Sequence, residues 1–77
     1  MIVRHKDSAE IMQITGYSQS INGPALELWD HELGITSPAL AANFRPLTED
    51  AADLIEIAKS YYGPYKYTEM YWKHFNE

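Results

Sequence analysis

The chain has no cysteine among its 77 residues, and this combination limits how it can be stabilised. A chain of this length buries only roughly 60% of the surface that its unfolded form exposes. The core alone therefore supplies no more than about 3–5 kcal/mol. From the length we expect one domain, residues 1–77. Because disulfides and thiolate metal sites are excluded, we expect this domain to gain stability from a partner or from oligomerisation. The same absence fits a reducing compartment, so we expect a cytoplasmic protein.

The charge balance is acidic, with six Lys and Arg against eleven Asp and Glu and a formal net charge of −5. This charge repels polyanions at long range and argues against non-specific nucleic-acid binding, although it leaves room for a locally basic face. No apolar run approaches the roughly 20 residues that span a bilayer. Residues 1–7 contain no apolar region long enough for a signal peptide. We therefore expect no membrane partner.

The first helix signal lies at residues 7–10, whose sequence Asp-Ser-Ala-Glu has the form of a capping box. It predicts a short helix over residues 8–15, and this helix would bury Ile11 and Ile14. Gly16 would then end the helix in the left-handed conformation.

A second helix is predicted from Pro24 to Leu33. Proline suits the first helical position because its missing N–H is no loss there. Leu26, Trp29 and Leu33 fall at i, i+3 and i+7, on one helical face, and a glycine follows. The alternation over residues 26–29 could instead begin a strand, but the proline start and the glycine stop favour a helix. Trp29 is then expected in the core.

The third helix signal is the clearest. Thr48 is a good N-cap, and acidic residues follow it where the positive end of the helix dipole favours them. An apolar stripe then runs along the segment: Ala51, Leu54, Ile55, Ala58 and Tyr62. Gly63 and Pro64 would end this helix.

Residues 35–47, between the second and third helices, fit two structures. Ser37 followed by Pro38 could open a short helical turn. Alternatively, the alternation over residues 40–45 is typical of a hairpin strand. The sequence does not decide between them.

Three segments in the middle of the chain occur in an order that is found in a known family of domains. A predicted helix ending at Gly16 precedes one that carries Leu-Trp-Asp-His-Glu-Leu-Gly-Ile at residues 28–35. Asn-Phe-Arg-Pro-Leu-Thr-Glu-Asp at residues 43–50 then opens the third helix. Over about residues 8–62 the series resembles the MerR-type winged helix-turn-helix domain. The resemblance implies a mainly α fold of three to four helices with a possible short β-hairpin wing, followed by an aromatic tail at residues 63–77.

The resemblance also implies a small DNA-binding regulator or accessory protein, with duplex DNA as its partner. At the matching position, Arg45 would lie in the wing and contact a phosphate. The surface facing the major groove would be the start of the second helix, around residues 20–27, where Ser20 and Asn22 supply polar groups. Outside the matched segment, Arg4, His5 and Lys6 could also contact phosphate.

A second functional hypothesis is an acidic protein-binding module, such as a phage-type inhibitor or adaptor. It rests on the net charge and on the aromatic C-terminal tail, because Tyr and Trp are enriched at protein interfaces. The candidate partner-binding or homodimer residues are Tyr65, Tyr67, Tyr71, Trp72 and Phe75. The plainer explanation of these aromatics is that they close the domain's own core.

The basic residues separate the two hypotheses. Arg45 could simply form a surface ion pair with a nearby acid such as Glu49 or Asp50. Arg4 and Lys6 could belong to a solvated arm. If these three cations cluster on one face, DNA is favoured, whereas scattered cations favour the protein-binding module.

The remaining polar residues predict no catalytic or metal site. His5, His31 and His74 show no i, i+4 pairing that would suit zinc. The Ser, His and Asp residues follow no recognisable nucleophile-elbow or triad order, and no Gly-rich phosphate loop is present. We therefore expect neither an enzyme nor a bound metal or cofactor.

Overall fold

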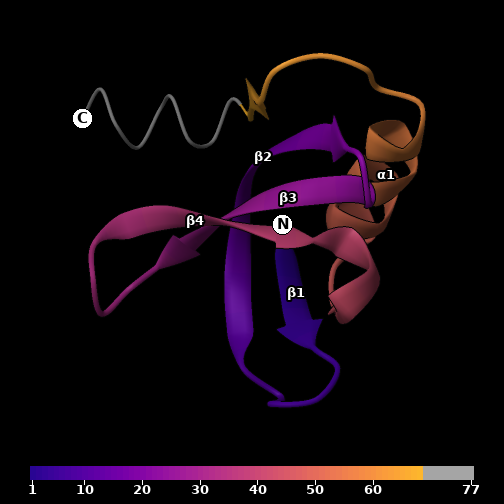
Figure 1. Cartoon of the computed structure of the whole chain (residues 1–77). Coiled ribbons are helices and arrows are strands. Elements are labelled where there is room, and N and C mark those ends of the chain that lie inside the picture. The colour runs from indigo at the N-terminus through magenta and orange to yellow at the C-terminus, as the bar shows by residue number, and fades with distance from the viewer. Residues whose placement is uncertain (69–77) are drawn as a thin grey trace.

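The computed structural model describes residues 1–68, and antiparallel strands dominate this part of the chain (Figure 1). Its strands are β1 (Ile2–His5), β2 (Ile11–Ser20), β3 (Gly23–Asp30), β4 (Ile35–Leu40), β5 (Phe44–Pro46) and β6 (Lys66–Tyr67). Two helical segments accompany them, the 3-10 helix η1 (Ala41–Asn43) and the α-helix α1 (Glu49–Lys59). With 49% strand against 21% helix, the expectation of a mainly α fold is wrong.

The strands form a sheet of order β4-β3-β2-β1-β5, in which every neighbouring pair is antiparallel. Strands β1 to β4 follow one another as an up-and-down meander. The chain then turns through η1, and β5 returns to pair with β1. The short strand β6 pairs with β2. The β1–β5 pairing therefore joins the start of the chain to residues 44–46.

The inward and outward faces of the sheet follow the period-2 alternation of its strands. In β3, Leu26 and Leu28 point into the core and are 0% and 1% exposed. Glu27 and Trp29 occupy the opposite face because successive strand side chains alternate. In β2 the alternation shifts at a bulge between Ile14 and Gly16, and such bulges bend a strand.

The helix predicted over residues 8–15 is wrong. Residues 6–8 form a turn, and β2 begins at Ile11, which is 60% exposed. In this turn the backbone N–H groups of Asp7 and Ser8 donate to Nδ1 of His5, and that of Glu10 donates to the Ser8 hydroxyl. Ile14 is buried as expected, but on a strand.

The helix predicted from Pro24 to Leu33 is also wrong, because its first part is β3. The alternation over residues 26–29 was the better signal. Leu33 is 68% exposed in the β3–β4 turn, and Trp29 is only half-buried on the outer face of the sheet rather than in the core. With strands at both predicted DNA-binding helices, the winged helix-turn-helix architecture is overturned as well.

The helix after Thr48 is confirmed. The Thr48 hydroxyl accepts from the N–H of Ala51 at 3.4 Å, and α1 then runs from Glu49 to Lys59. Its apolar stripe packs against the sheet, although Tyr62 lies beyond the end of the helix and is exposed. Between β3 and α1, each alternative for residues 35–47 holds only in part, because β4 and β5 are strands while Ala41–Asn43 between them forms the single helical turn η1.

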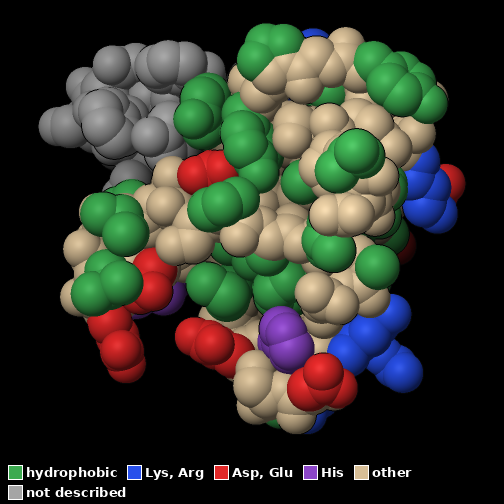
Figure 2. Space-filling view, viewed as in Figure 1, with side chains coloured by type: hydrophobic (Ala, Val, Ile, Leu, Met, Phe, Trp, Pro, Cys, Tyr) green, Lys and Arg blue, Asp and Glu red, His purple; other side chains and the backbone are tan. Residues whose placement is uncertain are grey.

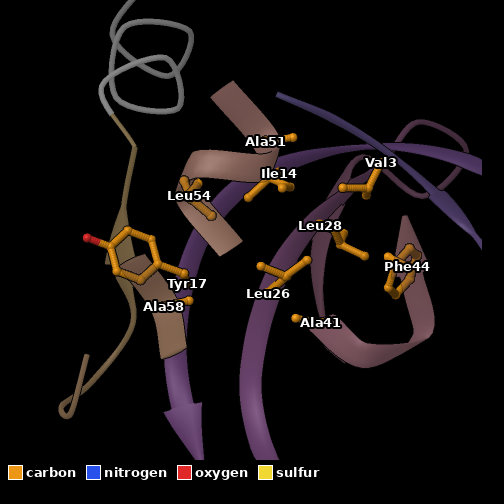
Figure 3. Packing of buried hydrophobic residues seen from close by; sticks show 10 residues of the cluster. All are labelled: Val3, Ile14, Tyr17, Leu26, Leu28, Ala41, Phe44, Ala51, Leu54 and Ala58. Atoms are coloured by element: carbon orange, nitrogen blue, oxygen red, sulfur yellow. The ribbon is translucent and has the colours of Figure 1, made fainter. Parts of the chain in front are cut away.

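The core fills the space between the inner face of the sheet and α1, as Figure 3 shows. The sheet and η1 contribute Val3, Ile14, Tyr17, Leu26, Leu28, Ala41 and Phe44. The helix contributes Ala51, Leu54 and Ala58. The small alanines of α1, two of them 0% exposed, allow the helix to approach the sheet closely.

Candidate anion-binding site

Arg4 and Arg45 are direct partners across the β1–β5 ladder. The residues that precede them, Val3 and Phe44, are buried in the core. Alternation therefore places both arginines on the outer face of the sheet. Directly opposed side chains on one face have Cβ atoms about 4.5–5.5 Å apart, so the two guanidinium groups extend from nearly the same point of the surface.

Lys6 and His5 extend this site along the chain. Lys6 directly follows β1, and its N–H donates to the carbonyl oxygen of Asn43 at 2.9 Å, which continues the pairing beyond the strand. Together Arg4, His5, Lys6 and Arg45 line a hollow of ≈ 250 Å³, here called the basic pocket. Figure 2 shows Lys and Arg side chains gathered at the lower right, near the β1–β2 turn.

The His5 ring is held in one orientation. Its Nδ1 accepts hydrogen bonds from the backbone N–H groups of Asp7 at 3.1 Å and Ser8 at 3.2 Å. The ring meets Phe44 edge-on, with centroids 5.0 Å apart and an interplanar angle of 87°. Because Nδ1 accepts, the neutral ring carries its proton on Nε2, and that N–H is its remaining donor.

The cations of the basic pocket have no acidic partner in the described part of the chain, where no carboxylate lies within 4.0 Å of them. Asp50, one expected partner of Arg45, instead lies 3.4 Å from the amino group of Met1. It also accepts a hydrogen bond from the Thr48 hydroxyl. This hydrogen bond, with a smaller contribution from the N-terminal charge, lowers the pKa of Asp50. The ion pair suggested for Arg45 is therefore absent from residues 1–68.

The arrangement of Arg4 and Arg45 is unfavourable for folding in isolation. Like charges directly opposite each other on a sheet are destabilising. Cross-strand pairs in general change the free energy of folding by roughly 0.2–1 kcal/mol. Lys59, in contrast, has its Nζ 2.7 Å from a carboxylate oxygen of Glu56. The cations of the basic pocket lie close together, have no neutralising partner within residues 1–68 and do not help the fold. Such a cluster is typical of a site that binds an anion.

Two other residues predicted to contact DNA lie away from the basic pocket. Ser20 and Asn22 belong to the β2–β3 hairpin, at the opposite end of β2 from Ile11, the cross-strand partner of Arg4. The Ser20 hydroxyl donates to the carbonyl oxygen of Gly23 at 2.8 Å and accepts from the Asn22 N–H at 3.3 Å. These groups stabilise the turn.

The tail residues within the described chain make intramolecular contacts. Tyr67 pairs with Gly16 in the β6–β2 ladder. The Tyr65 hydroxyl interacts with Ser18 and with Glu27, which is only 7% exposed. Burial raises the pKa of Tyr65, and the Ser18 hydrogen bond opposes this effect. The other predicted partner-binding residues, Tyr71, Trp72 and Phe75, lie outside the described residues.

The sequence indicated Arg4, His5 and Lys6 as a segment that could touch phosphate, and the structure places all three residues in the lining of the basic pocket. Within residues 1–68, no group of three or more His, Asp or Glu side chains could hold a metal ion. No helix in this part of the chain is long and apolar enough to cross a membrane.

The fold and the site together define a small antiparallel β domain with a basic pocket at one edge of its sheet. Neither a protein-family model, nor a curated protein, nor a solved structure matches the chain.

Proposed function

We propose that this protein is a non-enzymatic binding module that contacts the phosphates of a nucleic acid through the basic pocket. The observation that carries the proposal is the convergence of Arg4, Lys6 and Arg45 without an acidic partner in the described chain. These are three of only six Lys and Arg residues in an acidic chain. Clustering on one face is the arrangement that distinguishes phosphate binding from a general acidic adaptor.

The chemistry of the pocket suits phosphate. The planar guanidinium groups of Arg4 and Arg45 can each donate two parallel hydrogen bonds to phosphate oxygens. Lys6 adds a compact charge with three donors. A cavity of ≈ 250 Å³ falls below the roughly 300–1,000 Å³ typical of whole small-molecule sites, so it fits a phosphate group better than a complete ligand.

Phosphate contacts hold a protein on nucleic acid without reading its sequence. In this chain, α1 packs its apolar stripe on the sheet and carries acidic residues in its first turn, so it is poorly suited to enter a groove. We therefore expect weak binding with little sequence preference. We place this activity in the cytoplasm because a chain without cysteine fits a reducing compartment.

The protein-binding alternative has less support from the described residues. Tyr65 and Tyr67, its two described candidates, contact the domain's own β2 and β3. That arrangement favours closure of the domain over an interface role for these two residues.

A salt titration tests the proposal. Binding of a fluorescent duplex and of the corresponding single strand is measured by anisotropy at several salt concentrations. With three cationic contacts to duplex DNA, the slope of log K against log salt is expected to be about −2.7, and Arg45→Ala should flatten it by about one unit. Lys66→Ala removes an exposed charge outside the pocket and should retain a slope closer to that of the unmodified protein. No binding at low salt, or equal losses in the two variants, would remove the proposal.

A further inference from the structure

We infer that the basic pocket takes a terminal phosphomonoester, the end phosphate of a nucleic acid or of a free nucleotide, in preference to an internal phosphodiester. This inference rests on the proposed function, because it names which phosphate the same site binds. Three observations support it: the cations lie close together, acidic residues lie around the pocket, and the apolar side chain of Ile11 lies next to it.

The cations converge on one point. Arg4 and Arg45 are cross-strand partners, and Lys6, in the turn directly after β1, lines the same hollow. Two residues of chain span at most about 6.6–7.2 Å, so Lys6 starts close to the arginine pair. Groups placed in this way surround one anion, whereas a strand of nucleic acid is usually tracked by cations along an extended groove.

A terminal phosphate suits such a convergent site better than an internal one. It carries about −1.5 to −2 charges at pH 7 and presents three free oxygens. An internal phosphodiester carries a single charge and is bridged on both sides. The three cations that line the hollow can use the additional oxygen and charge only when the phosphate is at an end.

The surroundings of the pocket disfavour a polyanion that continues past it. Asp7 and Glu10 are exposed in and next to the β1–β2 turn, directly after the residues that line the pocket. Outside the pocket, three lysines stand against eleven acidic residues in the whole chain. A ligand that enters with one end avoids most of this repulsion, whereas a backbone lying across the sheet does not.

An apolar side chain stands beside the cations. Ile11 is the partner of Arg4 on the β2 side, so Ile11, Arg4 and Arg45 form a row on the outer face of three adjacent strands. Ile11 is 60% exposed. It offers a contact to the organic group of a phosphate ester that inorganic phosphate lacks.

The experiment compares end groups on one strand. Single-stranded DNA of about 12 nucleotides, within the usual span of a small binding domain, is prepared with a 5′-phosphate, a 3′-phosphate or two hydroxyl ends. Affinity for the full chain is measured by anisotropy at low salt. One of the phosphorylated strands should bind at least about tenfold more tightly than the hydroxyl-ended strand, the gain of about one charge-assisted hydrogen bond.

Matched variants assign this preference to the pocket. Arg45→Gln should abolish it, whereas Lys66→Gln, which removes the same charge outside the pocket, should retain it. Circular dichroism of both variants verifies that they remain folded. Equal affinity for all three strands, with Arg45→Gln still weaker, overturns the terminal preference while leaving phosphate binding intact. Absence of binding to every strand overturns the proposed function as well.

Competition identifies the source of the phosphate. If adenosine monophosphate displaces the strand at the same affinity as the phosphorylated strand itself, the pocket recognises a free nucleotide and the nucleic-acid partner is overturned. Displacement only by phosphorylated strands supports a nucleic-acid end. Inorganic phosphate should compete more weakly than either ester, and equal competition would overturn the role of Ile11.

Discussion

The backbone N–H of Ile2 donates a hydrogen bond to the Thr48 hydroxyl oxygen over 3.1 Å, so one side chain joins β1 to the start of α1. The same oxygen accepts from the N–H of Ala51 as the helix N-cap. Its hydrogen is donated to Asp50. Thr48 therefore connects the strand that carries Arg4 to the helix that covers the core.

Replacing Thr48 tests this connection. Thr48→Ala removes the oxygen that serves two backbone donors, and it should lower the free energy of unfolding by about 1–2 kcal/mol. Thr48→Ser keeps the hydroxyl and should lose distinctly less. Urea unfolding followed by circular dichroism measures both variants. Equal losses would indicate that the methyl group, rather than the hydrogen bonds, is responsible.

The environment of Tyr65 predicts a change at alkaline pH. Burial raises its pKa above the ordinary value of 10.0. Because the folded-state pKa is the higher one, this contribution to stability is complete below pH 10.0 and is lost as the pH rises through the folded-state pKa. In an absorbance titration, we expect a tyrosine step later than that of exposed tyrosines. Tyr65→Phe should remove this late step, and Tyr62→Phe, at an 80% exposed position, should not.

Gly16 is required for the docking of β6. A Cβ atom at this position would lie 2.9 Å from the carbonyl oxygen of Lys66, closer than a side chain allows. Gly16→Ala should therefore loosen the β6–β2 pairing. The amide of Thr68, which donates to the carbonyl oxygen of Thr15 at 2.8 Å, should then lose protection in hydrogen exchange. If Thr68 stays protected while the core amides of β3 exchange faster, the crowding acts on the core instead.

The sequence predicts α1 well because the signals for that helix are local. An N-cap, a first turn of acids and an apolar stripe at helical spacing all lie within a dozen residues. The strands were misread because short apolar runs fit both periods. Leu26, Trp29 and Leu33 fit a helical face, yet the pair that is buried is Leu26 and Leu28. The local pattern fits both the helical period and the strand period. The pairing of this segment with β2 and β4, which the local pattern does not contain, makes it a strand.

The site could be predicted only in pieces for a related reason. Arg4, Lys6 and Arg45 were recognised individually as possible phosphate contacts. Their meeting depends on the return of β5 to β1, a contact between residues about 40 positions apart in the chain. The analogy that placed Ser20 and Asn22 on the same surface assumed a helix where the structure has a hairpin.

The arginine pair also predicts an opposition between stability and binding. Arg45→Thr removes a like charge opposite Arg4 and places a β-branched residue on a strand, so the protein should become more stable by about 0.2–1 kcal/mol at low salt. The electrostatic part of this gain should shrink as salt screens the charges, while the part due to strand propensity should remain. Lys66→Thr, also on a strand but without an opposing arginine, supplies the control for propensity. Urea midpoints at two salt concentrations measure these effects, and anisotropy should show weaker phosphate binding by the more stable Arg45→Thr variant. A gain in stability that is the same at both salt concentrations would mean that Arg4 and Arg45 do not repel each other in the free protein.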